Sequence, residues 1–269
     1  MIPSLVSFDA IVFDVDRTLL NLHQELPVGL EDELRLLANK GIRLAISTGR
    51  GLQLVNWTIL KLFDNLTTSS SHILNNGALI IDKLHHPIID HPIPSELVKQ
   101  ILSDVNHDSK LVLSTLDTTY VSHAFLKIAP QYTQYSKGNI RPISAYHFEP
   151  AYLINIKELY PKEIMSYSWS KQLSLFFLTP DNMMPSCDIT AKGISKGSGL
   201  REWAKLNQIP LAKVAVVGDS NNDLPMFAEA GFKIAMGNSE DSVKSQADLV
   251  IGHVDQGGLP QFLHRWQES

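Results

Sequence analysis

An apolar stretch that runs directly into two carboxylates is the feature of this sequence that most constrains its fold. Residues 10–14 read AIVFD, and Asp14 is followed after one valine by Asp16. Because side chains alternate along an extended chain, residues two positions apart share a face. The stretch therefore predicts a buried strand that delivers two carboxylates to one site.

Strand and helix patterns alternate at both ends of the chain. Residues 27–41 have apolar side chains at helical spacing and a closing glycine, and residues 42–47 form a second apolar strand pattern. Such a βαβ unit implies parallel strands joined by a crossover. We expect a strand, a turn at Asn76 and Gly77, and another strand over residues 72–81. The alternation resumes with a helix over 197–208, a strand over 213–219, a helix over 222–231, and short strands over 233–237 and 248–252.

The middle of the chain is less regular. Helix signals over 95–106 and 161–172 mix with strand-like stretches at 111–116, 152–156 and 173–178. With 269 residues the chain also exceeds the usual single-domain size of roughly 100–200 residues. We therefore predict an α/β fold: a doubly wound, mostly parallel Rossmann-like core over residues 1–81 and 186–269, with an inserted α+β domain over residues 82–185.

Composition excludes several classes of partner. A formal net charge of -5 and the lack of a long Lys/Arg cluster argue against binding to nucleic acid or to an anionic membrane surface. No apolar run reaches about 18 residues, and the first residues lack a secretory pattern. The single cysteine, Cys187, agrees with a reducing compartment. We expect a cytoplasmic protein, and the sequence predicts no particular oligomeric state.

Polar clusters follow three of the expected strands. Asp14 and Asp16 follow the first, the segment STGR at 47–50 follows the second, and GDSNND at 218–223 follows the strand of the last third. In open parallel sheets, ligands bind beyond the carboxyl ends of the strands. A lone pair of aspartates often marks only a turn or a helix cap. Three such clusters predict one shared site.

The carboxylates of these clusters predict a metal. Two neighbouring carboxylates raise each other's pKa unless a cation lies between them. The candidate ligands are all acidic and no His/Cys ligand pattern or zinc spacing accompanies them, which favours Mg²⁺ over zinc. These ligands are Asp14, Asp16, Asp219 and Asp223.

A metal, a carboxylate nucleophile and nearby hydroxyl and ammonium donors suit phosphoryl transfer. In that reaction Asp14 could attack phosphorus to give an aspartyl phosphate. Asp16, on the same face, could protonate the leaving alcohol and later activate water.

The order DVDRT, STGR, SKGSGL and GDSNND resembles motifs one to four of the haloacid dehalogenase (HAD) superfamily. The segments NNGA at 75–78 and KIAMGNSEDSVKSQADLVI at 233–251 resemble its Cof-type (subclass IIB) phosphatase branch. This resemblance implies a Mg²⁺-dependent phosphomonoester hydrolase acting on a sugar phosphate or a similar small organophosphate. It also implies that the middle segment is a C2-type cap that closes over the core and meets the leaving group.

The resemblance assigns a role to each matching residue. Asp14 would be the nucleophile and Asp16 the general acid and base, while Mg²⁺ would contact Asp14, the backbone carbonyl of Asp16 and Asp219, with Asp223 acting through water. The residues that would bind the substrate or its phosphoryl group are Thr48, Gly49, Arg50, Lys196 and Asn222. Lys192 is a rival for the lysine role, but the phrase SKGSGL favours Lys196.

Arg17 departs from the pattern, because the Cof-type branch usually carries glycine at that position. Arg17 could reach a substrate anion or a cap residue, or it could point to solvent. Two alternatives to a hydrolase stay open. One is a phosphomutase of the same fold, which a phosphorylated sugar product would reveal. The other is a binding or regulatory protein without turnover, which the absence of Mg²⁺-dependent phosphate release would reveal.

Overall fold

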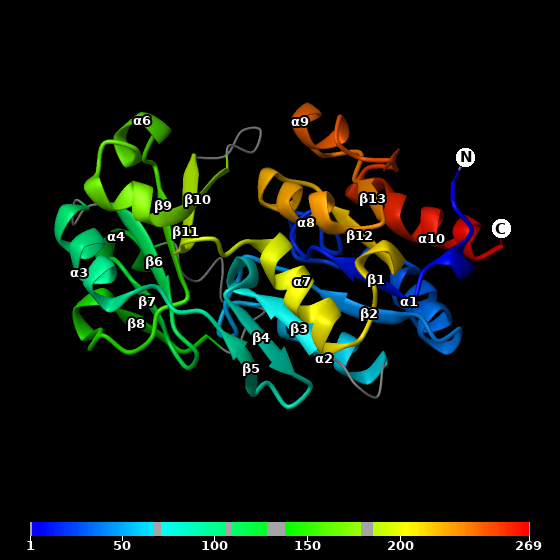
Figure 1. Cartoon of the computed structure of the whole chain (residues 1–269), viewed down its shortest axis with the longest axis horizontal. Coiled ribbons are helices and arrows are strands. Elements are labelled where there is room, and N and C mark those ends of the chain that lie inside the picture. Colours follow the sequence, from blue (N-terminus) through cyan, green and yellow to red (C-terminus); the bar gives the residue numbers. More distant parts are fainter. Residues whose placement is uncertain (1, 67–70, 106–108, 128–137, 179–184, 269) are drawn as a thin grey trace.

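The chain folds into two lobes, as the computed structural model shows (Figure 1). The structure describes residues 2–66, 71–105, 109–127, 138–178 and 185–268. One lobe holds a five-stranded sheet, and the other holds a six-stranded sheet built from the middle of the chain. We call the first lobe the core and the second the cap.

The core sheet has the strand order β14-β13-β12-β1-β2, and all of its neighbouring strands are parallel. Strand β1, between β12 and β2, is fully buried because successive side chains contact opposite faces: Ile11 and Phe13 join one hydrophobic cluster, while Ala10 and Val12 join another. The strands are β1 (Ala10–Phe13), β2 (Arg43–Ile46), β12 (Val214–Gly218), β13 (Phe232–Ala235) and β14 (Leu249–Val250).

Helices cover both faces of this sheet, as a doubly wound fold requires. The cluster around Phe13 includes residues of α1 (Leu30–Asn39), α2 (Trp57–Leu66) and α10 (Gly258–Glu268). The opposite cluster includes residues of α7 (Lys196–Leu206), α8 (Leu224–Glu229) and α9 (Asp241–Lys244). The predicted α/β fold class and the alternation of strands and helices in the core are thereby confirmed.

A small antiparallel sheet extends the core beside β2. It consists of β3 (Ser71–Leu74), β4 (Leu79–Asp82) and β5 (Pro87–Asp90), in that order. An isolated parallel bridge between Ser47 and Ile73 joins it to the end of β2. The predicted turn between β3 and β4 is the short 3-10 segment Asn75–Gly77.

The cap sheet has the order β10-β11-β9-β6-β7-β8, and its pairs are antiparallel except for β7 and β8. Helices α3 (Ser95–Asp104) and α6 (Pro161–Ile164) pack on one face. The short helix α4 (His123–Leu126) contributes Phe125 to a small cluster with Val112 and Val121. The strands are β6 (Lys110–Ser114), β7 (Thr119–Val121), β8 (Ile140–Pro142), β9 (Leu153–Lys157), β10 (Leu173–Leu178) and β11 (Ser186–Ala191).

Strand pairing differs from the expected domain boundaries at two places. Strand β11, which we expected in the core, pairs with β9 and β10 of the cap. Strand β5, which we expected in the inserted domain, pairs with β4 of the core. Pairing between strands distant in sequence is invisible to local patterns. We therefore propose that the cap spans residues 91–191 rather than 82–185.

The single helix expected over 161–172 was wrong. The segment divides into α6 and a 3-10 turn, Ser168–Gln172, which inserts the fully buried ring of Trp169 into the cap core. The last helix ends beside the start of the chain, where Trp266 Nε1 donates a hydrogen bond of 2.8 Å to the carbonyl of Pro3. None of the described helices has the length and apolar character that crossing a membrane requires.

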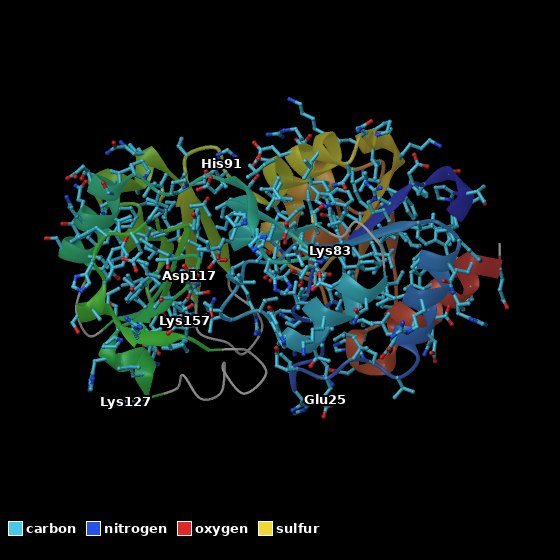
Figure 2. The ribbon with its side chains drawn as sticks, turned by 90° about the horizontal axis from the view of Figure 1, so that it is seen from below. Glu25, Lys83, His91, Asp117, Lys127 and Lys157 are labelled. Atoms are coloured by element: carbon cyan, nitrogen blue, oxygen red, sulfur yellow. The ribbon has the colours of Figure 1, made fainter. Side chains whose placement is uncertain are left out.

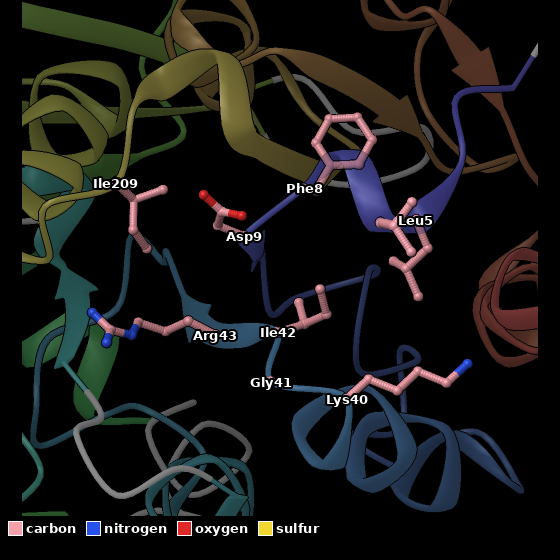
Figure 3. Close-up of a pocket in the computed structure, with 9 residues that line it drawn as sticks. Leu5, Phe8, Asp9, Lys40, Gly41, Ile42, Arg43 and Ile209 are labelled. Atoms are coloured by element: carbon pink, nitrogen blue, oxygen red, sulfur yellow. The ribbon is translucent and has the colours of Figure 1, made fainter.

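Two cavities lie at opposite ends of the core sheet. A cavity of about 470 Å³ lies at the amino ends of β1 and β2 and is lined in part by Leu5, Phe8, Asp9, Lys40, Arg43 and Ile209 (Figure 3). The other, of about 440 Å³, lies between the carboxyl ends of the core strands and the cap. The second is lined by six of the predicted site residues: Asp14, Asp16, Gly49, Arg50, Asp219 and Asn222. Figure 2 shows Lys157, which lines the second cavity, on the cap side of the molecule.

Candidate active site

The ends of β1, β2 and β12 meet at one edge of the core sheet. The backbone amide of Asp14 donates a hydrogen bond of 2.9 Å to the carbonyl of Val217 in β12. The backbone amide of Ser47 donates one of 2.7 Å to the carbonyl of Phe13 in β1. The ladder thus continues one residue beyond each strand. It places Asp14, Thr48 and Asp219 at the same edge, which is the convergence expected from the sequence.

Lys196 enters this edge from the start of α7 and is completely buried. Its Nζ donates 2.5 Å to Asp14 Oδ1 and 2.6 Å to Asp223 Oδ1. A Cβ added at Gly197 would lie 2.3 Å from the carbonyl oxygen of Pro225, so the helix start can approach α8 this closely only with glycine there. Lys192, the rival, is exposed and donates to the carbonyl of Lys171.

The charges of this buried group shift one another's pKa values. Burial raises the pKa of Asp14 to about 7, and Asp223 and Asp16 push it in the same direction while Lys196 opposes them. Burial alone would lower the pKa of Lys196, but the carboxylates of Asp14 and Asp223 raise it on balance. Lys196 is therefore charged and holds the side chain of Asp14 in place.

Asp14, Asp219 and Asp223 form a compact carboxylate group with one oxygen from each within 4.8 Å of the others. It is the only such cluster of potential metal ligands among the described residues. Asp223 is oriented by the backbone amides of Asp219, at 2.9 Å, and Ser220, at 3.0 Å, which donate to its Oδ2. Burial, together with Asp14 and Asp223, raises the pKa of Asp219 well above its ordinary value.

This group fits a divalent cation. Oδ2 of Asp219 is buried and accepts no hydrogen bond from the described residues, so this oxygen is still open to a ligand. All the atoms that could bind the metal are carboxylate oxygens, the ligands that hard cations such as Mg²⁺ prefer. The carboxylate of Asp16 lies outside this group, so the expected contact through its backbone carbonyl stays a prediction.

Asp16 is instead paired with Arg50. The guanidinium donates two hydrogen bonds to the carboxylate, one of 2.8 Å from Nε to Oδ2 and one of 2.5 Å from Nη2 to Oδ1. The side-chain amide of Gln24 donates a third, of 3.2 Å, to Oδ1. Enclosure by the protein raises the pKa of Asp16, but Arg50 outweighs it and the pKa is lowered on balance. Arg50, which we expected on a phosphoryl group, thus contacts the expected general acid.

Three other predicted residues surround the same edge. Thr48 is buried, and its Oγ1 accepts 3.1 Å from the backbone amide of Arg50. A Cβ added at Gly49 would lie 3.1 Å from side-chain oxygens of Asn76 and Asp188, so glycine lets the cap approach the core here. Asn222 Nδ2 donates 3.1 Å to Asn76 Oδ1.

Sequence reasoning missed the polar chain that links this edge to the cap. Asn76 Nδ2 donates 2.7 Å to Asp188 Oδ2, and Asn155 Nδ2 donates 2.7 Å to Asp188 Oδ1. Asp188 lies on β11 directly opposite Asn155 on β9. The aspartate in the strand-like stretch CDITA was the available signal, because a carboxylate on a buried strand needs hydrogen-bond partners.

Arg17 contacts the carboxylate group and lines the cavity under the cap. Its side chain is 23% exposed and its Nε lies 3.6 Å from Asp219 Oδ2. Its Nη2 donates 3.1 Å to the carbonyl of Asn238. Its contact with Asp219 places Arg17 within the carboxylate site itself, which the sequence did not predict.

Comparison with known proteins agrees with this geometry. The sequence profile of haloacid dehalogenase-like hydrolases matches residues 11–263. The phosphatase YwpJ of Bacillus subtilis is 27% identical, covering 94% of this chain and 98% of its own. The 5-amino-6-(5-phospho-D-ribitylamino)uracil phosphatase YcsE of the same organism is 25% identical over 97% of this chain and 96% of its own.

The solved structure of the HAD subclass IIB sugar phosphatase BT4131 superposes with a TM-score of 0.81 at 22% identity, covering 96% of this chain and 98% of that one. This likeness shows that both lobes have the subclass IIB fold. The chain therefore belongs to the haloacid dehalogenase-like hydrolases, as a phosphatase of their Cof-type, subclass IIB branch.

Proposed function

We propose that this enzyme hydrolyses phosphomonoesters of small hydroxylated metabolites, with Asp14 as nucleophile and Mg²⁺ as cofactor. The observation that carries the proposal is the buried contact of Lys196 with Asp14 and Asp223, next to an oxygen of Asp219 that accepts no hydrogen bond from the described residues. A bound Mg²⁺ would supply positive charge that offsets the phosphoryl oxygens. Asp14, Asp219 and Asp223 would hold it.

In the proposed reaction, a carboxylate oxygen of Asp14 forms a bond to phosphorus as the bond to the ester oxygen breaks. The buried ammonium of Lys196 keeps that carboxylate oriented and offsets negative charge as it develops. Asp14 must be ionised to attack, and the ammonium of Lys196 together with a bound Mg²⁺ would favour the ionised form. Water then cleaves the aspartyl phosphate.

Asp16 is the proposed donor of the proton that the leaving oxygen needs, and the proposed base toward water. It lines the cavity beside Asp14 and is partly exposed, so it can exchange a proton with solvent. The ion pair with Arg50 holds it ionised, hence the pair must open before Asp16 acts as an acid. Arg50 would then be free to bind the phosphoryl group, beside Thr48 and Asn222.

The leaving group would lie in the cavity of about 440 Å³ under the cap. The cap side of this cavity offers hydrogen-bonding side chains of Ser114, Asn155, Lys157, Ser186 and Asp188. These groups suit the hydroxyls of a sugar or polyol. YcsE acts on a phosphorylated ribityl compound and BT4131 on sugar phosphates, both rich in hydroxyls, which supports this substrate class. A cytoplasmic location stays a prediction from the sequence.

Phosphate release tests the proposal. Wild-type enzyme should release phosphate from a panel of sugar and polyol phosphates with Mg²⁺ and not with EDTA. Folded Asp14→Asn should lose the activity, whereas Asp9→Asn, at the opposite end of β1, should retain it. Equal release by Asp14→Asn would refute the nucleophile assignment. Transfer of the phosphoryl group to a second sugar instead of water would establish the phosphomutase alternative.

A further inference from the structure

The backbone of Arg17 has a conformation that arginine rarely adopts. Its φ is 61°, in the left-handed region that favours glycine. Asn238 holds it there: Asn238 Nδ2 donates 2.9 Å to the carbonyl of Arg17, and Arg17 Nη2 donates 3.1 Å to the carbonyl of Asn238. Asn238 is itself fixed by the amide of Val254, which donates 2.9 Å to its Oδ1. The direction of the guanidinium is therefore set from both ends of the side chain.

In this direction the guanidinium meets the carboxylate of Asp219, whose negative charge is the least compensated of the three carboxylates. Among the residues that the structure describes, Lys196 pairs with Asp14 and Asp223, and only Arg17 pairs with Asp219. The contact of 3.6 Å between Arg17 Nε and Asp219 Oδ2 is an ion pair and is too long for a good hydrogen bond. It supplies charge while leaving the oxygen open to a ligand.

We propose that Arg17 is a built-in competitor of the divalent cation, which neutralises Asp219 in the metal-free enzyme and lowers its affinity for Mg²⁺. This inference rests on the proposed metal site. A cation arriving at Asp219 meets a guanidinium a few ångströms away, and repulsion between like charges in this partly buried place is weakly screened. The enzyme therefore requires a higher Mg²⁺ concentration than a chain with a neutral residue at this position.

The same arrangement predicts opposite effects on the metal-free and metal-bound protein. Without metal, loss of Arg17 leaves the buried Asp219 uncompensated, so the protein becomes less stable. With metal, the repulsion is gone and the cation stabilises the fold more. A residue that only braces the loop through Asn238 would lower the stability of both forms equally.

The test is direct binding of Mn²⁺, followed by the electron paramagnetic resonance signal of the free ion. Arg17→Gln keeps a flexible polar side chain on the same left-handed backbone but removes the charge. We expect it to bind Mn²⁺ about tenfold more tightly than wild type, the scale of a partly buried ion pair. Arg17→Lys, which keeps the charge, should bind like wild type. The control Arg43→Gln removes the same charge at the distant amino end of β2 and should leave binding unchanged.

Thermal unfolding of the same variants provides the second readout. Arg17→Gln should unfold at a lower temperature than wild type in EDTA and show a larger upward shift with Mn²⁺. Equal or weaker Mn²⁺ binding by Arg17→Gln, with wild type binding the ion, overturns this inference and leaves the metal site intact. No binding by wild type overturns both, and Asp219→Asn, which should abolish binding, confirms where the ion sits.

Discussion

Asn76 in the core donates a hydrogen bond of 2.7 Å to Asp188 in the cap. Asn222, beside the carboxylate group, contacts the other side of the Asn76 amide. The carboxylate group of the core and the cap side of the cavity are thus joined by a polar chain that runs through Asn222, Asn76 and Asp188. Burial raises the pKa of Asp188, although the amides of Asn155 and Asn76 oppose this shift.

The first prediction concerns substrate choice by Asp188. In the wild type, the amides of Asn76 and Asn155 both donate to the carboxylate of Asp188. In Asp188→Asn, the new amide nitrogen faces one of these two donors, so one of the hydrogen bonds is lost. We expect KM for hydroxylated phosphate esters to rise about tenfold, the scale of one buried hydrogen bond, while kcat changes less. Steady-state kinetics on the best sugar phosphate and on p-nitrophenyl phosphate measures this. The aryl ester, which has no hydroxyl chain, should be affected less.

A matched control is available on the same lobe. Asp117 is an exposed cap aspartate outside the cavity, and Asp117→Asn should leave both KM values unchanged. If Asp188→Asn instead lowers kcat for both substrates equally, Asp188 acts by positioning the cap and does not select the leaving group.

The second prediction concerns Lys196. Replacing it by methionine keeps a similar volume but leaves Asp14 and Asp223 buried without their cation. Removing one partner of a buried ion pair typically costs about 3–5 kcal/mol, so the free energy of unfolding should fall by about that amount. Urea unfolding in EDTA measures it, and phosphate release should be lost. The exposed Lys192→Met should change the free energy of unfolding by less than about 0.5 kcal/mol.

The third prediction is a pH dependence of stability in the metal-free enzyme. The pKa of Asp14 in the folded state, about 7, lies above its ordinary value of 3.8. The folded state therefore holds this proton more tightly, and the stabilisation is complete below pH 3.8 and is lost as the pH rises through about 7. The raised pKa of Asp219 acts in the same direction. The lowered pKa of Asp16 affects stability only below pH 3.8, its ordinary pKa, and so outside the range in which Asp14 titrates.

Urea unfolding in EDTA at pH 5 and pH 8 checks this dependence. The free energy of unfolding should be greater at pH 5, and Asp14→Asn should reduce the difference between the two values. Asp9→Asn, which removes an exposed carboxylate, should preserve it. A difference that Asp14→Asn leaves unchanged would assign the titration to other groups.

The core was predictable because its buried parallel strands are short apolar runs that end in polar residues, as at Phe13 and Asp14. The boundaries of the cap could not be predicted in the same way. Strand β11 has the local pattern of a strand, but that pattern does not reveal that its partners are β9 and β10 of the cap. A local sequence pattern predicts that a segment forms a strand, but it does not predict which strand it pairs with.

The candidate site divides in the same way. Motif order predicted that Asp14, Lys196, Asp219 and Asp223 would meet, and they do. The partners of Asp16 and Asp219 were not foreseen. They depend on the directions of long arginine side chains, which tertiary contacts such as that between Arg17 and Asn238 decide.

The fourth prediction concerns how glycine positions the lysine. Gly77 has a φ of +93°, and a Cβ there would lie 2.1 Å from the carbonyl oxygen of Ser195, the residue that caps α7 just before Lys196. Gly77→Ala must therefore push the start of α7 away. Gly193→Ala provides the control, since Gly193 has a similar φ of +82° and nothing within 4 Å of the added carbon.

Left-handed strain alone should cost Gly193→Ala about 1–2 kcal/mol of the free energy of unfolding, with activity retained. Strain and clash together should cost Gly77→Ala about 3 kcal/mol or more. The displaced helix start also takes Lys196 out of reach of Asp14, so kcat should fall well beyond what the lost stability explains. Urea unfolding and phosphate release on the folded fraction separate the two effects. Equal costs for the two alanines would mean that α7 yields freely, and that the contact with Gly77 does not hold Lys196 in place.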